Sequence, residues 1–154
     1  MTKLDRKIVS GISKSRVRTW LKILKTSNLI EKQIKEKLRD DHNTTLPRFD
    51  VMSALYRSNH GLKMNEISGA LKVSNGNITG IIDRLVKEGN VLRVAIEGDR
   101  RANLVSLTNK GKKQFEEYAI AHESWINAML KNISEQDSQE LIDLLDSISQ
   151  INRS

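Results

Sequence analysis

The 154-residue sequence contains no cysteine, one proline and few aromatic side chains. Without cysteine, the chain can form no disulfide, no thiolate zinc site and no thiol redox sensor. No apolar run approaches the ~20 residues that cross a bilayer as a helix, so no membrane-spanning segment is expected. The N-terminus is basic but has no continuous apolar stretch, so we expect no secretory signal and a cytoplasmic location.

Signatures of catalysis are also missing. The three histidines, His42, His60 and His122, lie on separate segments. The sequence has no Gly-rich phosphate loop after a strand and no His-Glu-x-x-His motif. Too few ligand residues gather to place a zinc ion. We therefore expect no enzyme, no metal and no other cofactor.

Basic residues are in excess. Lysine and arginine number 26 against 19 aspartate and glutamate, which gives a formal net charge of +7. Such an excess favours a polyanionic partner, most often nucleic acid and less often an anionic membrane. The hydrophobic fraction of 38% is ordinary for a globular protein. The length fits one domain, or one core with an added oligomerisation lobe.

The spacing of apolar residues predicts a mainly α fold with a small β-hairpin. Helical spacing covers residues 14–40, 45–60, 63–72, 74–88, 109–130 and 134–151. Residues 91–96 and 102–107 alternate as two strands, with the sequence EGDRR as their turn. Thr45, Ser74 and Ser134 are suitable N-caps, and Pro47 fits the first turn after Thr45. The long first helix and the last two helices are expected to cover each other's apolar faces and those of a second chain.

The segment that begins at Ser74 carries the functional signal. One face is apolar, and the other is small and polar: Asn75, Gly76, Asn77, Thr79, Gly80, Asp83, Arg84 and Lys87. Asparagine can bond adenine bidentately, and threonine offers a hydroxyl and a methyl group to thymine. Gly76 and Gly80 let the backbone approach a groove, at a cost of about 1 kcal/mol each in helix propensity. Together with residues 63–72, this segment predicts a helix-turn-helix whose second helix reads the major groove.

Further basic residues extend this predicted interface. Arg100 and Arg101 at the hairpin turn suit the narrow, strongly negative minor groove of A·T-rich DNA. Phosphate contacts, which set affinity and its salt dependence, are expected from Lys72, Arg84, Lys87 and Arg93.

Two motifs with intact spacing resemble the MarR family of bacterial winged-helix transcriptional regulators: the DRL of residues 83–85 and the D-x-R-x-x-x-V-x-L-T of residues 99–108. The resemblance implies a winged helix-turn-helix at 45–108, an N-terminal arm and dimerisation helix at 1–40, and C-terminal dimerisation helices at 109–154. It implies a homodimer on a pseudo-palindromic operator. It also implies a salt bridge between Asp83 and Arg101, which leaves Arg100 for the minor groove.

The resemblance further implies a repressor that a small molecule releases from DNA. The segment with His122, Glu123 and Trp125 suggests an aromatic acid or aromatic acyl-CoA as effector. Effector candidates are Arg16, Trp20, Arg48 and His122, although Trp20 and His122 could equally belong to the core. Two alternatives stay open: a DNA-binding protein without a ligand, and a helical interaction protein. The latter leaves the exposed glycines and the two arginines unexplained.

Overall fold

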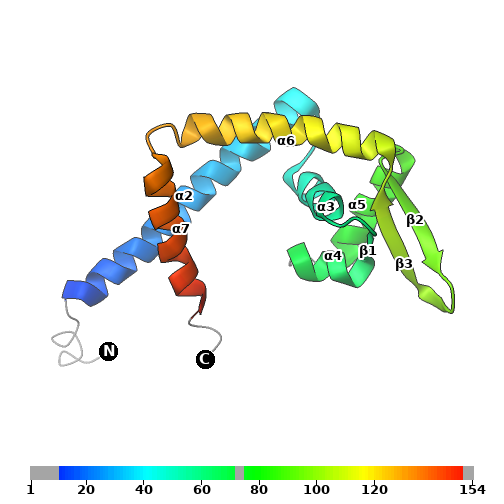
Figure 1. Cartoon of the computed structure of the whole chain (residues 1–154), viewed down its shortest axis with the longest axis horizontal. Coiled ribbons are helices and arrows are strands. Elements are labelled where there is room, and N and C mark those ends of the chain that lie inside the picture. Colours follow the sequence, from blue (N-terminus) through cyan, green and yellow to red (C-terminus); the bar gives the residue numbers. More distant parts are fainter. Residues whose placement is uncertain (1–10, 72–74, 151–154) are drawn as a thin grey trace. The chain divides into compact units, whose positions relative to one another are not determined.

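The computed structural model describes residues 11–71 and 75–150, and it is mainly helical with a small antiparallel sheet (Figure 1). The elements in chain order are α2 (Gly11–His42), α3 (Leu46–Arg57), β1 (Leu62–Lys63), α4 (Met64–Leu71), α5 (Asn75–Lys87), β2 (Val91–Ile96), β3 (Asp99–Leu107), α6 (Asn109–Met129) and α7 (Glu135–Ser149). The predicted helices and the predicted fold class are confirmed. The chain divides into two compact units, Met1–Tyr118 and Ala119–Ser154.

The core of the first unit lies among α3, α4, α5 and the sheet. Fully buried side chains come from each of these elements and from the end of α2: Leu38, Val51, Met52, Leu55, Ile67, Ile78, Ile82, Leu85, Val91 and Val105. Burying a side chain of this size stabilises a fold by about 1.5–3 kcal/mol. This shared core fixes the orientation of α5 within the unit.

The sheet has three strands in the order β1-β3-β2, where the sequence predicted a two-stranded hairpin. The prediction missed β1 because two residues give no readable alternation; Leu62 pairs with Val105 and Lys63 with Leu104. Gly61 precedes β1 with a φ of +81°, and a Cβ there would lie 2.7 Å from the carbonyl oxygen of Val105. Glycine is therefore needed for β1 to reach β3.

The turn of the hairpin is shorter than predicted. β2 ends at Ile96 and β3 begins at Asp99, which leaves Glu97 and Gly98 as the turn, with Gly98 at a φ of +89°. Arg100 and Arg101 therefore belong to the first residues of β3, not to the turn. In Figure 1 the two strands extend together as an elongated hairpin.

Two of the predicted caps are confirmed. The Thr45 side chain accepts a hydrogen bond from the Arg48 N–H, with Pro47 in the first turn of α3. Ser134 and Asp137 form a reciprocal capping box at the start of α7. Each such cap satisfies backbone N–H groups that the helix leaves unpaired, which typically stabilises the helix end by about 1 kcal/mol.

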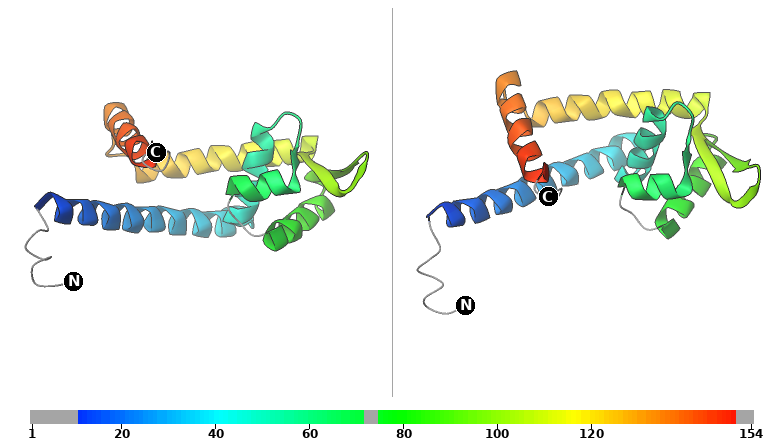
Figure 2. Two further views of the ribbon diagram at one scale, coloured as in Figure 1. Left: turned by 90° about the horizontal axis from the view of Figure 1, so that it is seen from below. Right: turned by 60° about the horizontal axis from the view of Figure 1, so that its bottom comes forward.

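Helix α2 is a single helix of 32 residues, longer than predicted (Figure 2). Its buried residues, Ile34 and Leu38, both lie in its last third. The N-terminal two thirds therefore contribute little to the core of the first unit. No described helix combines the length and the apolar character that crossing a membrane requires.

Candidate nucleic-acid interface

Helix α5 separates an apolar from a polar face as the sequence predicted. Ile78, Ile82 and Leu85 are fully buried, and Ile81 is half-buried. The opposite face is exposed and includes Asn77, Thr79, Gly80, Asp83, Arg84 and Lys87. Burial of one face holds the helix to the core, so the polar face is presented as a rigid surface.

Gly80 lies on this exposed face, and a Cβ built there meets no heavy atom within 4 Å. Packing within the chain therefore does not require a glycine at this position. Its helix-propensity cost has no compensation inside the described part of the chain. A binding partner that must approach the backbone of α5 closely would explain why residue 80 is a glycine.

Several predicted contact residues lie outside the described part of the chain. These are Lys72 and Ser74, the surroundings of Gly76, and the side chains of Asn75, Arg100 and Arg101. The predicted cap at Ser74 and the predicted ion pair of Arg101 with Asp83 stay predictions.

Asp83 forms an ion pair with Arg93 of β2. The Arg93 Nη2 and the Asp83 Oδ1 are 2.6 Å apart. Arg93, which the sequence predicted as a phosphate contact, thus joins the outer face of α5 to the hairpin. Both side chains are partly exposed, so the pair contributes at most about 1 kcal/mol and mainly fixes orientation.

The C-terminal end of α5 is held by an ion pair from α3. The guanidinium of Arg48 donates to the Glu88 carboxylate, one residue after α5 ends. The Arg48 side chain is 16% exposed, and its Nε is buried without a hydrogen-bond partner. Water screens this pair less than a surface pair, so losing the Glu88 charge would leave a poorly solvated cation.

Residues around the start of α6 hold the same end of α5. The Lys110 Nζ donates to the Glu88 carbonyl oxygen at 2.7 Å, and the Thr108 Oγ1 donates to the Gly89 carbonyl oxygen at 2.7 Å. A cation at this end also interacts favourably with the helix dipole. We call the set Arg48, Glu88, Thr108 and Lys110 the C-terminal clamp of α5.

Gly111 brings α6 close enough for this clamp to form. A Cβ at this position would lie 2.0 Å from the carbonyl oxygen of Asn90. The Thr108 backbone N–H also donates to that oxygen at 3.0 Å. Because no side chain fits between α6 and Asn90, the start of α6 packs directly against the backbone that follows α5.

A pair of aromatic rings includes Tyr118, which lies near Arg48 and Glu88 of the clamp. His42 and Tyr118 meet edge-on with ring centroids 5.2 Å apart. Burial raises the pKa of the Tyr118 hydroxyl, the nearby positive charge of Arg48 opposes this shift, and Glu88 reinforces it. Tyr118 is thus held neutral beside the Arg48–Glu88 pair.

The predicted effector residues occupy different places. Arg16 and Trp20 lie on the exposed N-terminal part of α2, and Trp20 is 57% exposed, so it is not part of the described core. Trp20 is 22 residues from the end of α2, about 33 Å along the axis at ~1.5 Å per residue. Arg48 lies beyond that end in the clamp, so one subunit does not bring Arg48 together with Trp20. His122 is half-buried on α6, in the second unit.

A cavity of about 250 Å³ opens between α2, α3 and α4. It is lined by Glu31, Lys35, Leu46, Pro47, Asp50 and Leu71. Lys35 lies 3.5 Å from Glu31, so its charge is already partly neutralised. None of the four predicted effector residues lines this cavity.

Sequence reasoning missed the clamp. Its partners are up to 40 residues apart, and each one looks locally like a solvated polar residue. The available signal was Thr108 as a helix N-cap, since its Oγ1 accepts from the Gly111 N–H at 3.0 Å.

Comparisons with known proteins agree on one family. The MarR family profile matches residues 44–102. The uncharacterized HTH-type transcriptional regulator YfiV of Bacillus subtilis is 34% identical over 115 residues, which are 74% of this chain and 68% of YfiV. The HTH-type transcriptional repressor YetL of the same organism is 28% identical over 64% of this chain and 59% of YetL.

A crystal structure of a MarR family transcriptional regulator from Silicibacter pomeroyi has the same fold. It is 33% identical, and the match covers 92% of this chain and 97% of that one with a TM-score of 0.76.

Proposed function

Because the chain belongs to the MarR family of winged-helix, DNA-binding transcriptional regulators, which are not enzymes, we propose that it binds a specific operator as a homodimer in the cytoplasm and regulates transcription. One observation carries this proposal. The apolar face of α5 is buried apart from the half-buried Ile81, and its C-terminal end is clamped. Among the described residues, its outer face carries small, polar and charged side chains and one apolar side chain, Val86. A rigid helix of this kind suits the major groove.

Within this proposal, base reading belongs to the N-terminal half of α5 and to the residues before it: Ser74, Asn75, Gly76, Asn77, Thr79 and Gly80. Arg84 and Lys87 in its last turn would contact phosphates and set the salt dependence. Arg100 and Arg101 would approach the minor groove from the start of β3.

The homodimer is supported by the apolar faces that the chain leaves uncovered. Large apolar side chains on α2 and α7 are about 40–60% exposed. Contiguous apolar faces of this kind are unusual on a monomer and mark an interaction surface. Two subunits would present two α5 helices to a pseudo-palindrome.

We further propose that the protein is a repressor that an aromatic acid or aromatic acyl-CoA releases from DNA. Arg16 and Trp20 are one helical turn apart and exposed, which offers a cation beside an aromatic ring to an anionic aromatic ligand. His122 stays a candidate, whereas the clamp gives Arg48 a structural role. A ligand on a dimer-forming helix would change the spacing of the two α5 helices, which couples the two sites.

The test of DNA binding is a fluorescence anisotropy titration against the intergenic region upstream of the gene. We expect nanomolar affinity that falls steeply with salt and far weaker binding to shuffled DNA. A DNA affinity that depends neither on the base sequence nor on the salt concentration would instead support the alternative that the chain is a helical interaction protein.

The test of the effector is a thermal-shift screen of aromatic acids and their CoA thioesters, followed by the same titration with each hit. A ligand that prefers the folded form raises the melting temperature. We expect a hit to weaken operator binding and Trp20→Ala to remove its effect. Hits that leave operator affinity unchanged would favour a regulator without this ligand.

A further inference from the structure

Strand β2 forms an open edge of the sheet. In the order β1-β3-β2 it pairs with β3 on one side and with no described strand on the other, and Figure 1 shows it on the outer side of the hairpin. An edge strand carries a row of backbone N–H and C=O groups that no neighbouring strand satisfies. The pairing with β3 is regular from Val91 to Ala95 and shifts between Ala95 and Ile96, close to the turn. Most of this edge is therefore a regular strand that can accept another.

One face of this edge strand is apolar and exposed. Leu92 and Val94 are 55% and 56% exposed, and they share one face because successive side chains of a strand point to opposite faces. Leu104 of β3 lies directly opposite Val94 and is half-buried, so it belongs to the same face. We call Leu92, Val94 and Leu104 the apolar face of the hairpin.

Strand β2 lacks the residues that commonly protect an edge. Natural edge strands often carry lysine or proline, which oppose pairing with another chain. The sequence VLRVAI contains neither. Its charged residue, Arg93, points to the opposite face, where it forms the ion pair with Asp83 of α5. The edge therefore presents no unpaired charge and no missing backbone N–H to an incoming strand.

The proposed contacts of the chain do not account for the apolar face of the hairpin. This face lies on the side of the sheet opposite to Arg93, and so it points away from the side that is joined to α5. The proposed homodimer covers apolar side chains of α2 and α7, which are different elements. The face and the open edge thus stay available to a partner that supplies a strand.

A second copy of β2 is such a partner. A two-fold axis at the edge places the two strands antiparallel, with one residue opposite its own counterpart. The same axis leaves both apolar faces on one side of the joined sheet. Leu92 and Val94 of each copy would then lie beside those of the other, and the open backbone groups of both edges would be paired. The strand is therefore complementary to itself in hydrogen bonding and in apolar surface.

Charge and backbone pairing select the register of this contact. Centring on Arg93 would place two guanidinium groups directly opposite each other, which is destabilising. Centring on Leu92 would place Val94 opposite Asn90, whose backbone N–H and C=O are already bonded to Leu85 and Thr108. Centring on Val94 pairs Val94 with its counterpart and Arg93 with Ala95, all within the regular part of the strand.

We propose that β2 pairs edge to edge with β2 of a second copy, centred on Val94, and so joins one homodimer to another. The contact adds to the homodimer proposed above, and the strand pairing itself depends neither on the operator nor on the terminal helices. A single pair of short strands buries little surface, so the association is weak in free solution. It becomes effective where neighbouring sites on one DNA hold two dimers close together.

Single cysteines test the register, because the natural chain contains none. In Val94→Cys the two thiols lie opposite each other, with Cα atoms about 4.5–5.5 Å apart, which suits a disulfide. Glu97→Cys is the control: residue 97 is also exposed, but its Cα atoms would be about 20 Å apart in this register. After mild oxidation, we expect at least tenfold faster cross-linking of Val94→Cys than of Glu97→Cys on a non-reducing denaturing gel.

A lysine on the edge tests the association without any cross-link. We expect the unmodified protein to form assemblies of two or more dimers in a concentration series by analytical ultracentrifugation. Val94→Lys places a charge on the edge and should leave dimers only. Asn59→Lys adds the same charge at an exposed turn after α3 and should associate as the unmodified protein does. Circular dichroism and melting temperature check that each variant is folded.

Three outcomes would overturn the proposal. Equal cross-linking of Val94→Cys and Glu97→Cys would indicate random collision of hairpins. An equal loss of association in Val94→Lys and Asn59→Lys would show that net charge, not the strand edge, governs assembly. Dimers that do not associate at any concentration would show that the edge stays unpaired.

These measurements separate the strand pairing from the proposed function because they use no DNA. Cross-linking of Val94→Cys in a protein that binds no operator would contradict only the DNA-binding proposal. Operator binding by dimers that never associate would contradict only the strand pairing. Cross-linked pairs of monomers would keep the strand pairing and contradict the homodimer.

Discussion

Gly80 is a glycine that folding does not require but that DNA binding would explain. It lies on the exposed face of α5, and a Cβ would meet open space. In contrast, Gly61 and Gly111 are required by backbone oxygens 2.7 Å and 2.0 Å from the positions their Cβ atoms would occupy. Folding alone would accept alanine at residue 80 but not at these two positions.

Gly80→Ala should therefore stabilise the protein and weaken its binding to the operator. Alanine improves helix propensity by about 1 kcal/mol, while its methyl group prevents close approach to the groove. We expect a melting temperature higher by a few degrees and an operator dissociation constant at least tenfold higher. Gly69→Ala on α4, which also meets no atom within 4 Å, is the matched control and should stabilise with less effect on DNA. Unchanged operator affinity in Gly80→Ala would mean that this face does not contact DNA.

Arg100→Ala should weaken operator binding clearly while the dimer stays intact. Loss of a minor-groove arginine removes both a charge and contacts to the groove, which we expect to cost about 1–3 kcal/mol of binding free energy. Anisotropy titration gives the affinity, and ultracentrifugation gives the oligomeric state. Arg39→Ala on α2 removes the same charge outside the hairpin and should change affinity little. Equal affinities for the two variants would show that the hairpin is not a wing in use.

Among the elements, α5 depends on distant partners for its position. Its N-terminal half would meet bases, while its C-terminal end is held by Arg48 from α3 and by Lys110 and Thr108 from the start of α6. A helix fixed at one end and buried along one face has little freedom to tilt. The clamp therefore connects the packing of α3 and α6 to the surface proposed to read DNA.

Glu88→Gln should loosen this clamp without changing the shape of the side chain. The change leaves the mostly buried Arg48 without its counter-charge, which we expect to cost about 1–2 kcal/mol of unfolding free energy. Operator affinity should fall several-fold because α5 is less well oriented. Urea denaturation and the anisotropy titration measure the two effects.

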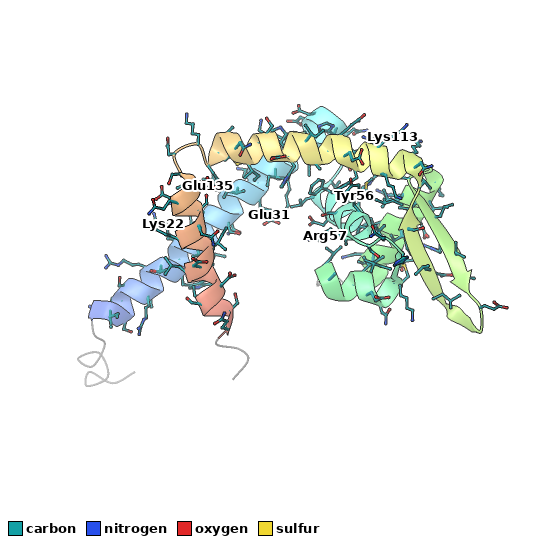
Figure 3. All side chains as sticks on the ribbon, in the orientation of Figure 1. Lys22, Glu31, Tyr56, Arg57, Lys113 and Glu135 are labelled. Atoms are coloured by element: carbon teal, nitrogen blue, oxygen red, sulfur yellow. The ribbon has the colours of Figure 1, made fainter. Side chains whose placement is uncertain are left out.

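Glu116→Gln on α6 is the control for Glu88→Gln. Glu116 also accepts a hydrogen bond, from the Tyr56 hydroxyl at 3.0 Å, but at an exposed site (Tyr56 is labelled in Figure 3). Its replacement should leave operator affinity unchanged. An equal loss of affinity in both variants would show that the clamp does not position α5.

The sequence predicted those features that depend on neighbouring residues. The buried face of α5 follows from local spacing, as do the caps at Thr45 and Ser134. It did not predict β1 or the Arg48–Glu88 pair, because their partners lie about 40 residues away along the chain. Arg100 and Arg101 were predicted to lie in the turn because the sequence EGDRR does not show which two residues form it. The structure places the turn at Glu97 and Gly98, where Gly98 has a positive φ.

As a whole, the proposed homodimer presents two identical DNA-reading surfaces. The exposed apolar side chains on α2 and α7 support the proposed homodimer, and the net charge of +7 favours association with DNA. A symmetric pair of α5 helices should bind two half-sites about one helical turn apart. The sequence preference of the protein must then itself have two-fold symmetry.

Selection from a pool of random DNA duplexes, followed by sequencing, tests this claim most directly. We expect an enriched pseudo-palindrome with half-site centres about 10 base pairs apart, and loss of the enriched bases in a parallel selection with Asn77→Ala. A pool that stays random, or an enriched motif without two-fold symmetry, would contradict it.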